Sequence, residues 1–281
     1  MQTKIGFIGS GNMAQSIALG LLEQNWNNQQ LMVFSPNAAS KAWIQQKQIS
    51  IAKSISQLST DCNVLILATK PQQAQQALAS ISLNSEQCLI SVAAGISTQY
   101  IYQVLSANQS NQALTRVIRA MPNTPSLISS GVCGLYAETL TRELYADLAE
   151  SIFSAIGSFV WIKDESLMDV VTAISGSGPA YYFLIVEGMI SAAIELGMDK
   201  KSATKLATET LSGAAALLKS TELDPTSLRQ QVTSPGGTTA AALESFKTDK
   251  LQQIIFNAVS AAKDRGILLN KECLDRLNTK P

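Results

Sequence analysis

The first half of the chain alternates between short apolar runs and stretches with helical periodicity. The apolar runs, which are typical of strands covered on both faces, lie at residues 4–8, 31–34, 63–68 and 88–94. Two further strands are predicted at residues 132–136 and 158–162, with a helix over residues 142–155 between them. Because strands and helices alternate up to about residue 162, the sequence predicts a mostly parallel α/β sheet.

The strand pattern stops beyond Glu165, and the rest of the chain has helical spacing of its apolar residues. Helices are predicted at residues 167–174, 179–196, 200–218 and 225–232, and from residue 238 to about 265 in two pieces. We therefore expect a doubly wound, Rossmann-type α/β domain at residues 1–163, followed by an all-α domain at residues 164–281.

The helix predicted at residues 179–196 is the most apolar of these. Its stripe consists of Tyr182, Ile185, Val186, Met189, Ala193 and Leu196, and Gly197 is expected to end it. Such a stripe predicts a long buried helix. The cover is either the rest of the same subunit or a second subunit.

A glycine-rich segment follows the first predicted strand and opens the first predicted helix. Residues 9–14 have the pattern G-x-G-x-x-A. In a dinucleotide-binding turn, Gly9 allows the tight turn, Gly11 lets a pyrophosphate approach the backbone, and Ala14 lets helix and strand pack closely. The strands and helix around this segment favour nucleotide binding over a purely structural turn.

The end of the second predicted strand bears on the choice of cofactor. An acidic residue there binds the ribose diol of NADH, but this chain has Ser35, Pro36 and Asn37, with Lys41 a helical turn further on. Hydroxyl, amide and ammonium groups tolerate a 2′-phosphate, which a carboxylate repels. We therefore expect NADPH, with NADH as the second choice. The alternative is that Ser35 and Asn37 are plain turn residues.

The ends of the next two apolar runs are further candidates for the cofactor site, because ligands of doubly wound sheets lie beyond the carboxyl ends of the strands. Thr69, Lys70 and Pro71 follow one run, and Ala94 closes the other, where small residues let the chain pass close to a nicotinamide ring. Arg119 and Asn123 come later, around a proline-bracketed loop. Without further context, their side chains are expected to hold that loop in place.

A Pro-Gly-Gly segment precedes an alanine-rich helix in the second half of the chain. Gly236 and Gly237 leave backbone N–H groups unshielded, and Thr238 or Thr239 can cap the helix. A helix N-terminus with free N–H groups favours a carboxylate or phosphate, and the hydroxyl of Ser234 adds a donor. The segment is therefore either an anion-binding loop or an ordinary turn that starts a helix.

The amino-acid composition limits the partners, catalytic groups and metal ligands that the chain can offer. The 21 basic residues balance the 21 acidic ones, so no nucleic acid or anionic membrane is expected as a partner. The chain has no histidine, which removes the usual general base and zinc ligand, and we expect no metal. Its four cysteines form no C-x-x-C pair and no signal peptide precedes the first strand. These features predict reduced thiols and a cytoplasmic location.

Four segments, in order along essentially the whole chain, resemble those of the pyrroline-5-carboxylate reductase family. They are residues 68–72 (ATKPQ), 116–125 (RVIRAMPNTP), 175–181 (SGSGPAY) and 233–239 (TSPGGTT). The resemblance implies NAD(P)H-dependent reduction of the cyclic imine 1-pyrroline-5-carboxylate to L-proline, the last step of proline biosynthesis. It also implies that the helical domain is a dimerisation domain, interlocked with that of a second subunit in a homodimer or larger ring.

The pattern and the resemblance together assign the candidate residues. Those expected to bind substrate are Ser234, Gly236, Gly237, Thr238 and Thr239. Those expected to bind cofactor are Gly9, Ser10, Gly11, Asn12, Met13, Ser35, Asn37, Ala68, Thr69, Lys70, Pro71 and Ala94. Because no histidine is available, we expect Thr239 to hydrogen-bond the ring nitrogen while water or the incoming iminium supplies the proton.

Two other functions stay open on the sequence. A related imine or β-hydroxyacid reductase has the same two-domain plan. Hydroxyacid oxidation commonly uses a lysine base on the interdomain helix, and this chain has none between Pro179 and Lys200. The second alternative, a non-catalytic NADPH-binding sensor, would bind the dinucleotide without consuming it.

Overall fold

A computed structural model describes residues 3–36, 42–107 and 115–278 of the chain. The described residues form two compact units, one from Met1–Ser177 with Ala261–Pro281 and one from Gly178–Ser260. The last strand ends at Trp161, just before the predicted domain boundary. The division into a cofactor domain at residues 1–163 and a helical domain at residues 164–281 stays a prediction.

The first unit is built on an eight-stranded sheet of order β3-β2-β1-β4-β5-β6-β7-β8. The strands are β1 (Ile5–Ile8), β2 (Leu31–Phe34), β3 (Ser50–Ile51), β4 (Val64–Leu67), β5 (Cys88–Ser91), β6 (Arg116–Met121), β7 (Gly131–Ala137) and β8 (Gly157–Trp161). All neighbours pair in parallel except β6 and β7, which are antiparallel. The predicted doubly wound, mostly parallel sheet is confirmed, and the order reverses at β1.

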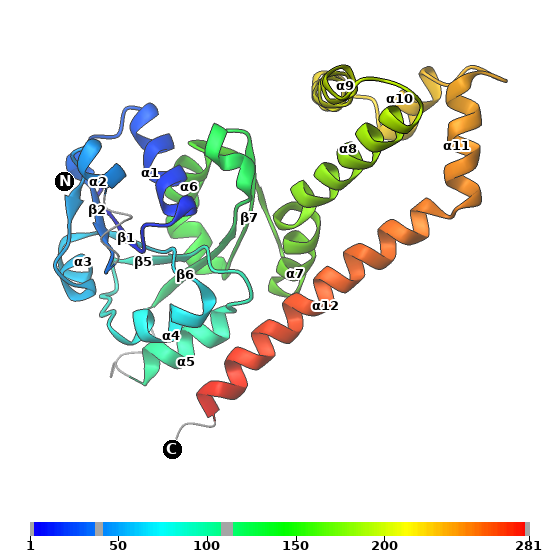
Figure 1. The fold of residues 1–281 in the computed structure, drawn as a ribbon. Helices are drawn as coiled ribbons and strands as arrows, with labels where there is room; N and C mark the ends of the chain where they lie inside the picture. The colour runs from blue at the N-terminus through cyan, green and yellow to red at the C-terminus, as the bar shows by residue number, and fades with distance from the viewer. Residues whose placement is uncertain (1–2, 37–41, 108–114, 279–281) are drawn as a thin grey trace. The chain divides into compact units, whose positions relative to one another are not determined.

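Helices cover both faces of this sheet (Figure 1). They are α1 (Asn12–Glu23), α2 (Ala42–Gln46), α3 (Ile55–Asp61), α4 (Pro71–Ala79), α5 (Thr98–Ser106), α6 (Thr139–Ser154) and α7 (Met168–Val171). Short 3₁₀ turns are η1 (Asn28–Gln30), η4 (Thr124–Ile128) and η5 (Glu165–Leu167), and a π-helical turn, η6, spans Thr172–Gly176. The π turn ends at Gly176, Ser177 is a bend, and a new helix begins at Gly178 with Pro179 as its second residue, close to the start predicted at residue 179.

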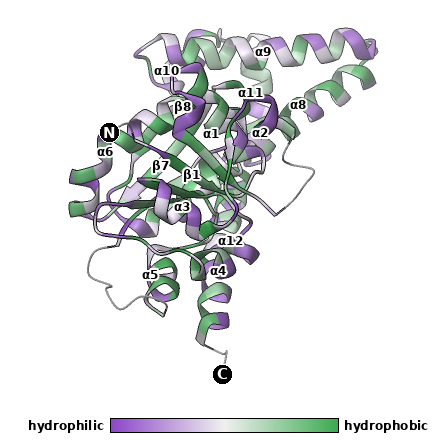
Figure 2. Cartoon of the chain, turned by 90° about the vertical axis from the view of Figure 1, so that its left-hand side faces the viewer, coloured by the Kyte–Doolittle hydropathy of each residue, from purple (hydrophilic) through white to green (hydrophobic). Residues whose placement is uncertain are grey.

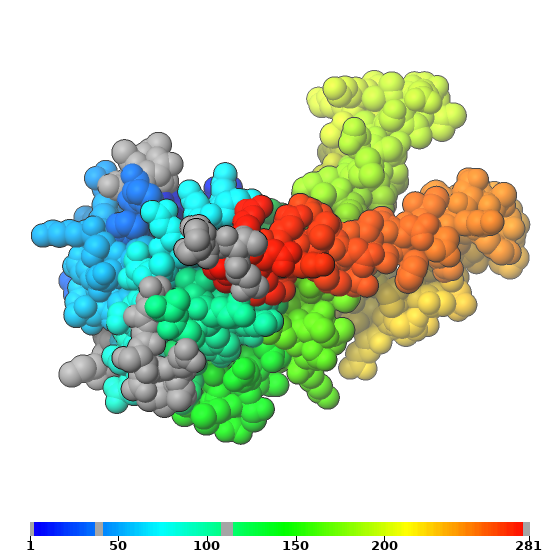
Figure 3. Space-filling model, turned by 90° about the horizontal axis from the view of Figure 1, so that it is seen from below, coloured from blue at the N-terminus to red at the C-terminus, as the bar shows by residue number. Residues whose placement is uncertain are grey.

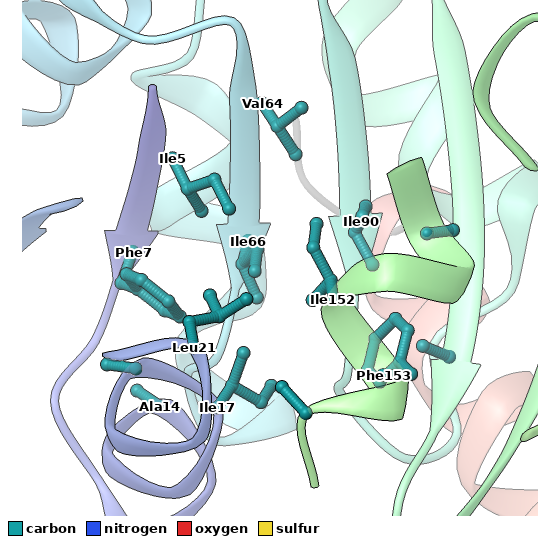
Figure 4. Packing of buried hydrophobic residues seen from close by; sticks show 14 of the residues in the cluster. Ile5, Phe7, Ala14, Ile17, Leu21, Val64, Ile66, Ile90, Ile152 and Phe153 are labelled. Atoms are coloured by element: carbon teal, nitrogen blue, oxygen red, sulfur yellow. The ribbon is translucent and has the colours of Figure 1, made fainter. Parts of the chain in front are cut away.

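Alternate residues of the inner strands enter two hydrophobic clusters, one on each face of the sheet. Phe7 and Ile66 pack with α1 and α6 on one face (Figure 4), whereas Ile8 and Leu67 pack with α3, α4 and α5 on the other. Because both faces are buried, the strands need apolar residues at every position. Figure 2 shows this as green strands in the middle of the sheet.

The second unit is all helical, as predicted. It contains α8 (Gly178–Glu195), α9 (Lys200–Ser220), α10 (Pro225–Gln231), α11 (Thr238–Thr248) and the first turns of α12 (Leu251–Asn278). Gly197 follows α8 with φ of +98°, the left-handed conformation that ends helices and favours glycine. Over residues 3–36, 42–107 and 115–278, none of the helices combines the length and hydrophobicity needed to cross a bilayer.

The α8 helix is exposed in the single chain, which contradicts burial within its own subunit. Phe183, Leu184 and Leu196 have exposed fractions of 66%, 67% and 88%. Helix α8 contacts α9, where Ala203 and Ala207 are buried, and within the described part of the chain most of its large apolar side chains stay exposed. A contiguous apolar surface of this kind marks a protein interface.

Candidate functional site

The glycine-rich turn after β1 has the geometry that its sequence predicts. Gly9 has φ of +107°, and its N–H donates to the carbonyl of Phe34 at 2.9 Å. A Cβ atom on Gly9 would lie 2.6 Å from the backbone oxygen of Ala68. Since neither the dihedral angle nor the space admits a side chain, the close approach of the β1 and β4 ends depends on glycine here.

The start of α1 is open for an anion. Gly11 is the N-cap residue, no side chain caps the helix, and a Cβ on Gly11 would meet nothing within 4 Å. Ala14 is fully buried and lets α1 lie close to the sheet. The unsatisfied N–H groups at the helix N-terminus and the empty space above Gly11 together fit a pyrophosphate.

The predicted cofactor residues gather at the carboxyl ends of β1, β2, β4 and β5, where the strand order reverses. The hydroxyl of Thr69 is buried without a hydrogen-bond partner. Lys70 is the exposed N-cap of α4, and Pro71 is the first residue of that helix. Ala94 lies half-buried after β5. A buried hydroxyl without a partner at this edge fits a polar ligand that supplies the missing hydrogen bond.

Two serines join the glycine-rich turn to the end of β2. Both are buried, and the Oγ–H of Ser10 donates to the Oγ of Ser35 at 2.7 Å. The Nε1–H of Trp43 donates to the carbonyl of Ser10 at 3.2 Å, which ties the turn to α2. Asn37, the other residue expected near a 2′-phosphate, lies outside the described residues, as does Lys41.

The Pro-Gly-Gly segment forms a tight turn at the start of α11. Gly236 has φ of +70°, and the N–H of Gly237 donates to the carbonyl of Ser234 at 3.0 Å. The N-cap residue is Gly237, and no side chain caps the helix. The prediction that Thr238 or Thr239 caps α11 is therefore wrong. The turn brings Gly237 into the extended conformation that an N-cap needs, and Thr238 is already the first helical residue.

The N-terminus of α11, which no side chain caps, favours the predicted anion-binding role of this turn. Because no side chain occupies the N-terminus of α11, its first backbone N–H groups stay available to a ligand. The turn lies in the second unit, whereas the residues predicted to bind cofactor lie in the first. Within its own unit the turn is exposed, with Thr239 half-buried beside it. The local geometry suits a small carboxylate.

The side chains of Arg119 and Asn123 hold the loop around residues 119–123 in place, as predicted. The guanidinium of Arg119 pairs with Glu165 at 2.7 Å, and the side chains of the pair are only 10% and 22% exposed. The Nδ2–H of Asn123 donates to the carbonyl of Ser175 at 3.1 Å, and its Oδ1 accepts from the N–H of Val132 at 2.9 Å. The segments 116–125 and 175–177 are thus held together within the first unit.

Sequence reasoning missed the role of Glu165. Its carboxylate accepts from the backbone N–H of Thr98 at 2.7 Å and from the hydroxyl of Thr98, in addition to Arg119. Burial raises the pKa of the Asp169 carboxyl, four residues further along the chain. The positive charge of Arg119 lowers that pKa, and the negative charge of Glu165 raises it. The only sequence signal was its position just after the last strand, which does not indicate which groups meet there.

Known proteins are similar to this chain over nearly its whole length. A curated pyrroline-5-carboxylate reductase from Haemophilus influenzae is 39% identical over 270 residues, which cover 95% of this chain and 97% of the relative. The chain belongs to the pyrroline-5-carboxylate reductase family.

Solved structures of pyrroline-5-carboxylate reductases have the same fold. The structure from Coxiella burnetii is 34% identical with a TM-score of 0.88, and the match covers 96% of this chain and 99% of that one. The structure from Plasmodium falciparum, which has NADP bound, is 26% identical with a TM-score of 0.81, covering 96% and 98%. The fold expected from the resemblance is thus confirmed.

Two family descriptions match separate parts of the chain. Residues 4–95 match "NADP oxidoreductase coenzyme F420-dependent", and residues 165–268 match "Pyrroline-5-carboxylate reductase dimerisation". The first match contains the glycine-rich turn and every described residue predicted to bind cofactor, which supports NAD(P)H as the cofactor. The second match contains α8 with its exposed apolar surface. Both features support a homo-oligomer of this chain.

Proposed function

We propose that this chain reduces 1-pyrroline-5-carboxylate to L-proline with NAD(P)H, the last step of proline biosynthesis. The observation that carries the proposal is similarity to a curated pyrroline-5-carboxylate reductase over 95% of the chain. The two helix N-termini without side-chain caps, at α1 and α11, support it, because the reaction needs one site for a dinucleotide and one for a small carboxylate.

The cofactor would be held by the carboxyl edge of the first unit. Backbone groups of Gly9, Ser10, Gly11, Asn12 and Met13 face the pyrophosphate in this proposal. The buried hydroxyl of Thr69 donates or accepts one of the missing hydrogen bonds, and Ala94 leaves room for the nicotinamide ring. NAD(P)H supplies the hydride when bound.

The substrate carboxylate would bind the turn that opens α11. The N–H groups of the helix start and the Ser234 hydroxyl bind the anion, and this anchoring sets the imine carbon in place for hydride transfer. Thr239, the second residue of α11, hydrogen-bonds the ring nitrogen. With no histidine in the chain, the proton on that nitrogen comes from water or from the incoming iminium.

The direct test mixes the protein with NADPH and pyrroline-5-carboxylate and follows the absorbance of the reduced nicotinamide. We expect NADPH consumption and formation of proline. A protein that binds NADPH but consumes none across a wide pH range would be the non-catalytic sensor. Turnover of other cyclic imines or of β-hydroxyacids, with none of pyrroline-5-carboxylate, would identify the related reductase instead.

Removing the Thr239 hydroxyl tests the proposed contact to the ring nitrogen. Thr239→Ala is expected to lower kcat/KM for pyrroline-5-carboxylate by roughly 5- to 150-fold, because one positioning hydrogen bond contributes about 1–3 kcal/mol to transition-state binding. Steady-state kinetics measure the effect. Thr248→Ala, at the exposed C-terminal end of the same helix, is the control and should behave as wild type. Unchanged turnover and affinity in Thr239→Ala would exclude the role.

A carboxylate at the end of β2 tests the cofactor preference. Ser35→Asp is expected to lower kcat/KM for NADPH by about tenfold or more relative to NADH, because the new charge repels the 2′-phosphate and binds the ribose diol. The measurement is the ratio of the two kcat/KM values, with Ser35→Ala as the uncharged control. An equal loss with both cofactors would show that Ser35 only maintains the Ser10 contact.

We also propose a homo-oligomeric assembly and a cytoplasmic location for this chain. The exposed apolar residues of α8 support interlocked helical domains in a homodimer or larger ring.

The cysteines bear on the location. Four of them are free thiols, which supports a reducing, cytoplasmic location: Cys62, Cys88, Cys133 and Cys273. The described residues contain no group of three or more His, Cys, Asp or Glu side chains placed to hold a metal ion. The proposed reaction needs none.

A further inference from the structure

The C-terminal part of α12 packs on the first unit through one helical face. That face consists of Gly266, Leu269, Asn270, Cys273, Leu274 and Leu277, spaced by three or four residues. Its last three members pack against the hydrophobic cluster that contains Tyr100 and Ile101 of α5. Figure 3 shows this red end of the chain lying directly on the cyan and green surface of the first unit.

The same face reaches the loop between β5 and α5, which includes the candidate cofactor residue Ala94. Gly95, the next residue, has φ of +70°, and a Cβ there would lie 3.2 Å from the Cβ of Leu269. The Oδ1 of Asn270 accepts from the backbone N–H of Ser97 at 3.3 Å. Helix α12 therefore contacts the loop at two residues beyond Ala94, Gly95 and Ser97.

Two further close approaches, one between α12 and α7 and one between Glu165 and α5, lie beside this loop. A Cβ on Gly266 would lie 2.9 Å from the Oδ1 of Asp169, so the helix passes directly over α7. Glu165, four residues before Asp169, accepts from the N–H of Thr98, the first residue of α5. The loop that carries Ala94 is thus fastened by groups from the chain beyond residue 164, and not only by the strand it follows.

We propose that Asn270 is a positioning residue, which holds the β5–α5 loop so that Ala94 stands at the right distance from the nicotinamide end of the cofactor. The proposal rests on the proposed function for the identity of the cofactor. Ser97 is the N-cap of α5, and its side chain already accepts from Tyr100, so its N–H is the group that α12 can use to fix the loop. Asn270 acts through this backbone group and does not touch the substrate.

The test replaces the acceptor while keeping the shape of the side chain. Asn270→Leu removes the acceptor, Asn270→Asp keeps an acceptor oxygen at the same place, and Lys271→Ala alters the adjacent exposed position as the control. Three quantities are measured on the full chain: NADPH dissociation constants from nicotinamide fluorescence, amide hydrogen exchange of residues 92–98 without cofactor, and steady-state kinetics. Thermal unfolding of each variant reports any loss of fold.

For Asn270→Leu we expect a three- to tenfold weaker NADPH affinity, at least tenfold faster exchange at Ser97, and a KM for pyrroline-5-carboxylate within twofold of wild type. Asn270→Asp and Lys271→Ala should stay within twofold of wild type in all three. If Asn270→Leu does not fold, Asn270→Ala takes its place with the same expectations.

Two results would overturn the proposal. One is Asn270→Leu matching Lys271→Ala in NADPH affinity and exchange. The other is Asn270→Asp failing as Asn270→Leu does, which would show that the acceptor oxygen is not the group on which the loop depends. A wild-type protein that binds NADPH without consuming it would overturn the proposed activity instead, and the affinity and exchange comparisons would still decide the role of Asn270.

Discussion

Gly9→Ala is expected to lose both folding stability and nucleotide binding. The new Cβ would lie 2.6 Å from the backbone oxygen of Ala68, on a residue whose φ is +107°. Left-handed strain and the clash with a fixed backbone atom together should lower the free energy of unfolding by about 2–4 kcal/mol. Urea denaturation measures this loss, and fluorescence titration with NADPH measures the affinity.

Gly11→Ala is the matched comparison, because it separates the fold from the ligand. Gly11 has φ of −71°, which alanine adopts freely, and a Cβ there meets no protein atom within 4 Å. The free energy of unfolding should therefore change by less than about 1 kcal/mol. NADPH affinity should fall by about tenfold or more, since the methyl group fills the space in which the pyrophosphate approaches the backbone. Wild-type affinity in Gly11→Ala would show that the phosphates bind elsewhere.

Glu165→Ala is expected to lower the free energy of unfolding by about 2–4 kcal/mol. The substitution leaves the guanidinium of Arg119, whose side chain is 10% exposed, without its carboxylate, and it also removes the acceptor of the Thr98 N–H. An unpaired buried charge costs more than the pair itself contributes. Urea denaturation, followed by circular dichroism, gives the difference from wild type.

The control for this prediction is an exposed ion pair. Arg265 and Glu272 also lie 2.7 Å apart, but their side chains are 53% and 37% exposed, so Glu272→Ala should cost less than about 1 kcal/mol. The double variant Arg119→Leu with Glu165→Leu should recover part of the stability lost in Glu165→Ala, because no charge is then left buried. Equal losses in Glu165→Ala and Glu272→Ala would contradict the assigned cost of burial.

Local patterns predicted much of this molecule correctly. The strand at residues 5–8, the turn at Gly9 and the helix that buries Ala14 were predictable, because each depends on a few neighbouring residues and one backbone constraint. The same holds for Pro71 at the first position of α4 and for Gly197 after α8. The helix cap at residue 238 or 239 was wrong, because the turn geometry of Gly236 decided where α11 begins.

Burial of α8 could not be settled from its composition. An apolar helix predicts that something covers it, but the sequence does not say whether the cover belongs to the same chain. In the single chain, Phe183 and Leu184 remain about two-thirds exposed, at 66% and 67%. Only the arrangement of α8 against α9 shows which side of the helix is left for another subunit.

Sequence patterns alone were enough to predict six of the eight strands, the glycine-rich turn and the family, and they predict an anion-binding turn at Ser234. These depend on contacts between neighbours in the chain, which composition and spacing encode directly. Only the tertiary structure decided that Glu165 joins Arg119 to Thr98, and that Asn270 reaches Ser97 across 173 positions of sequence. The physical reason is that such long-range hydrogen bonds are set by how β5, β6 and α12 pack, and no local pattern specifies that packing.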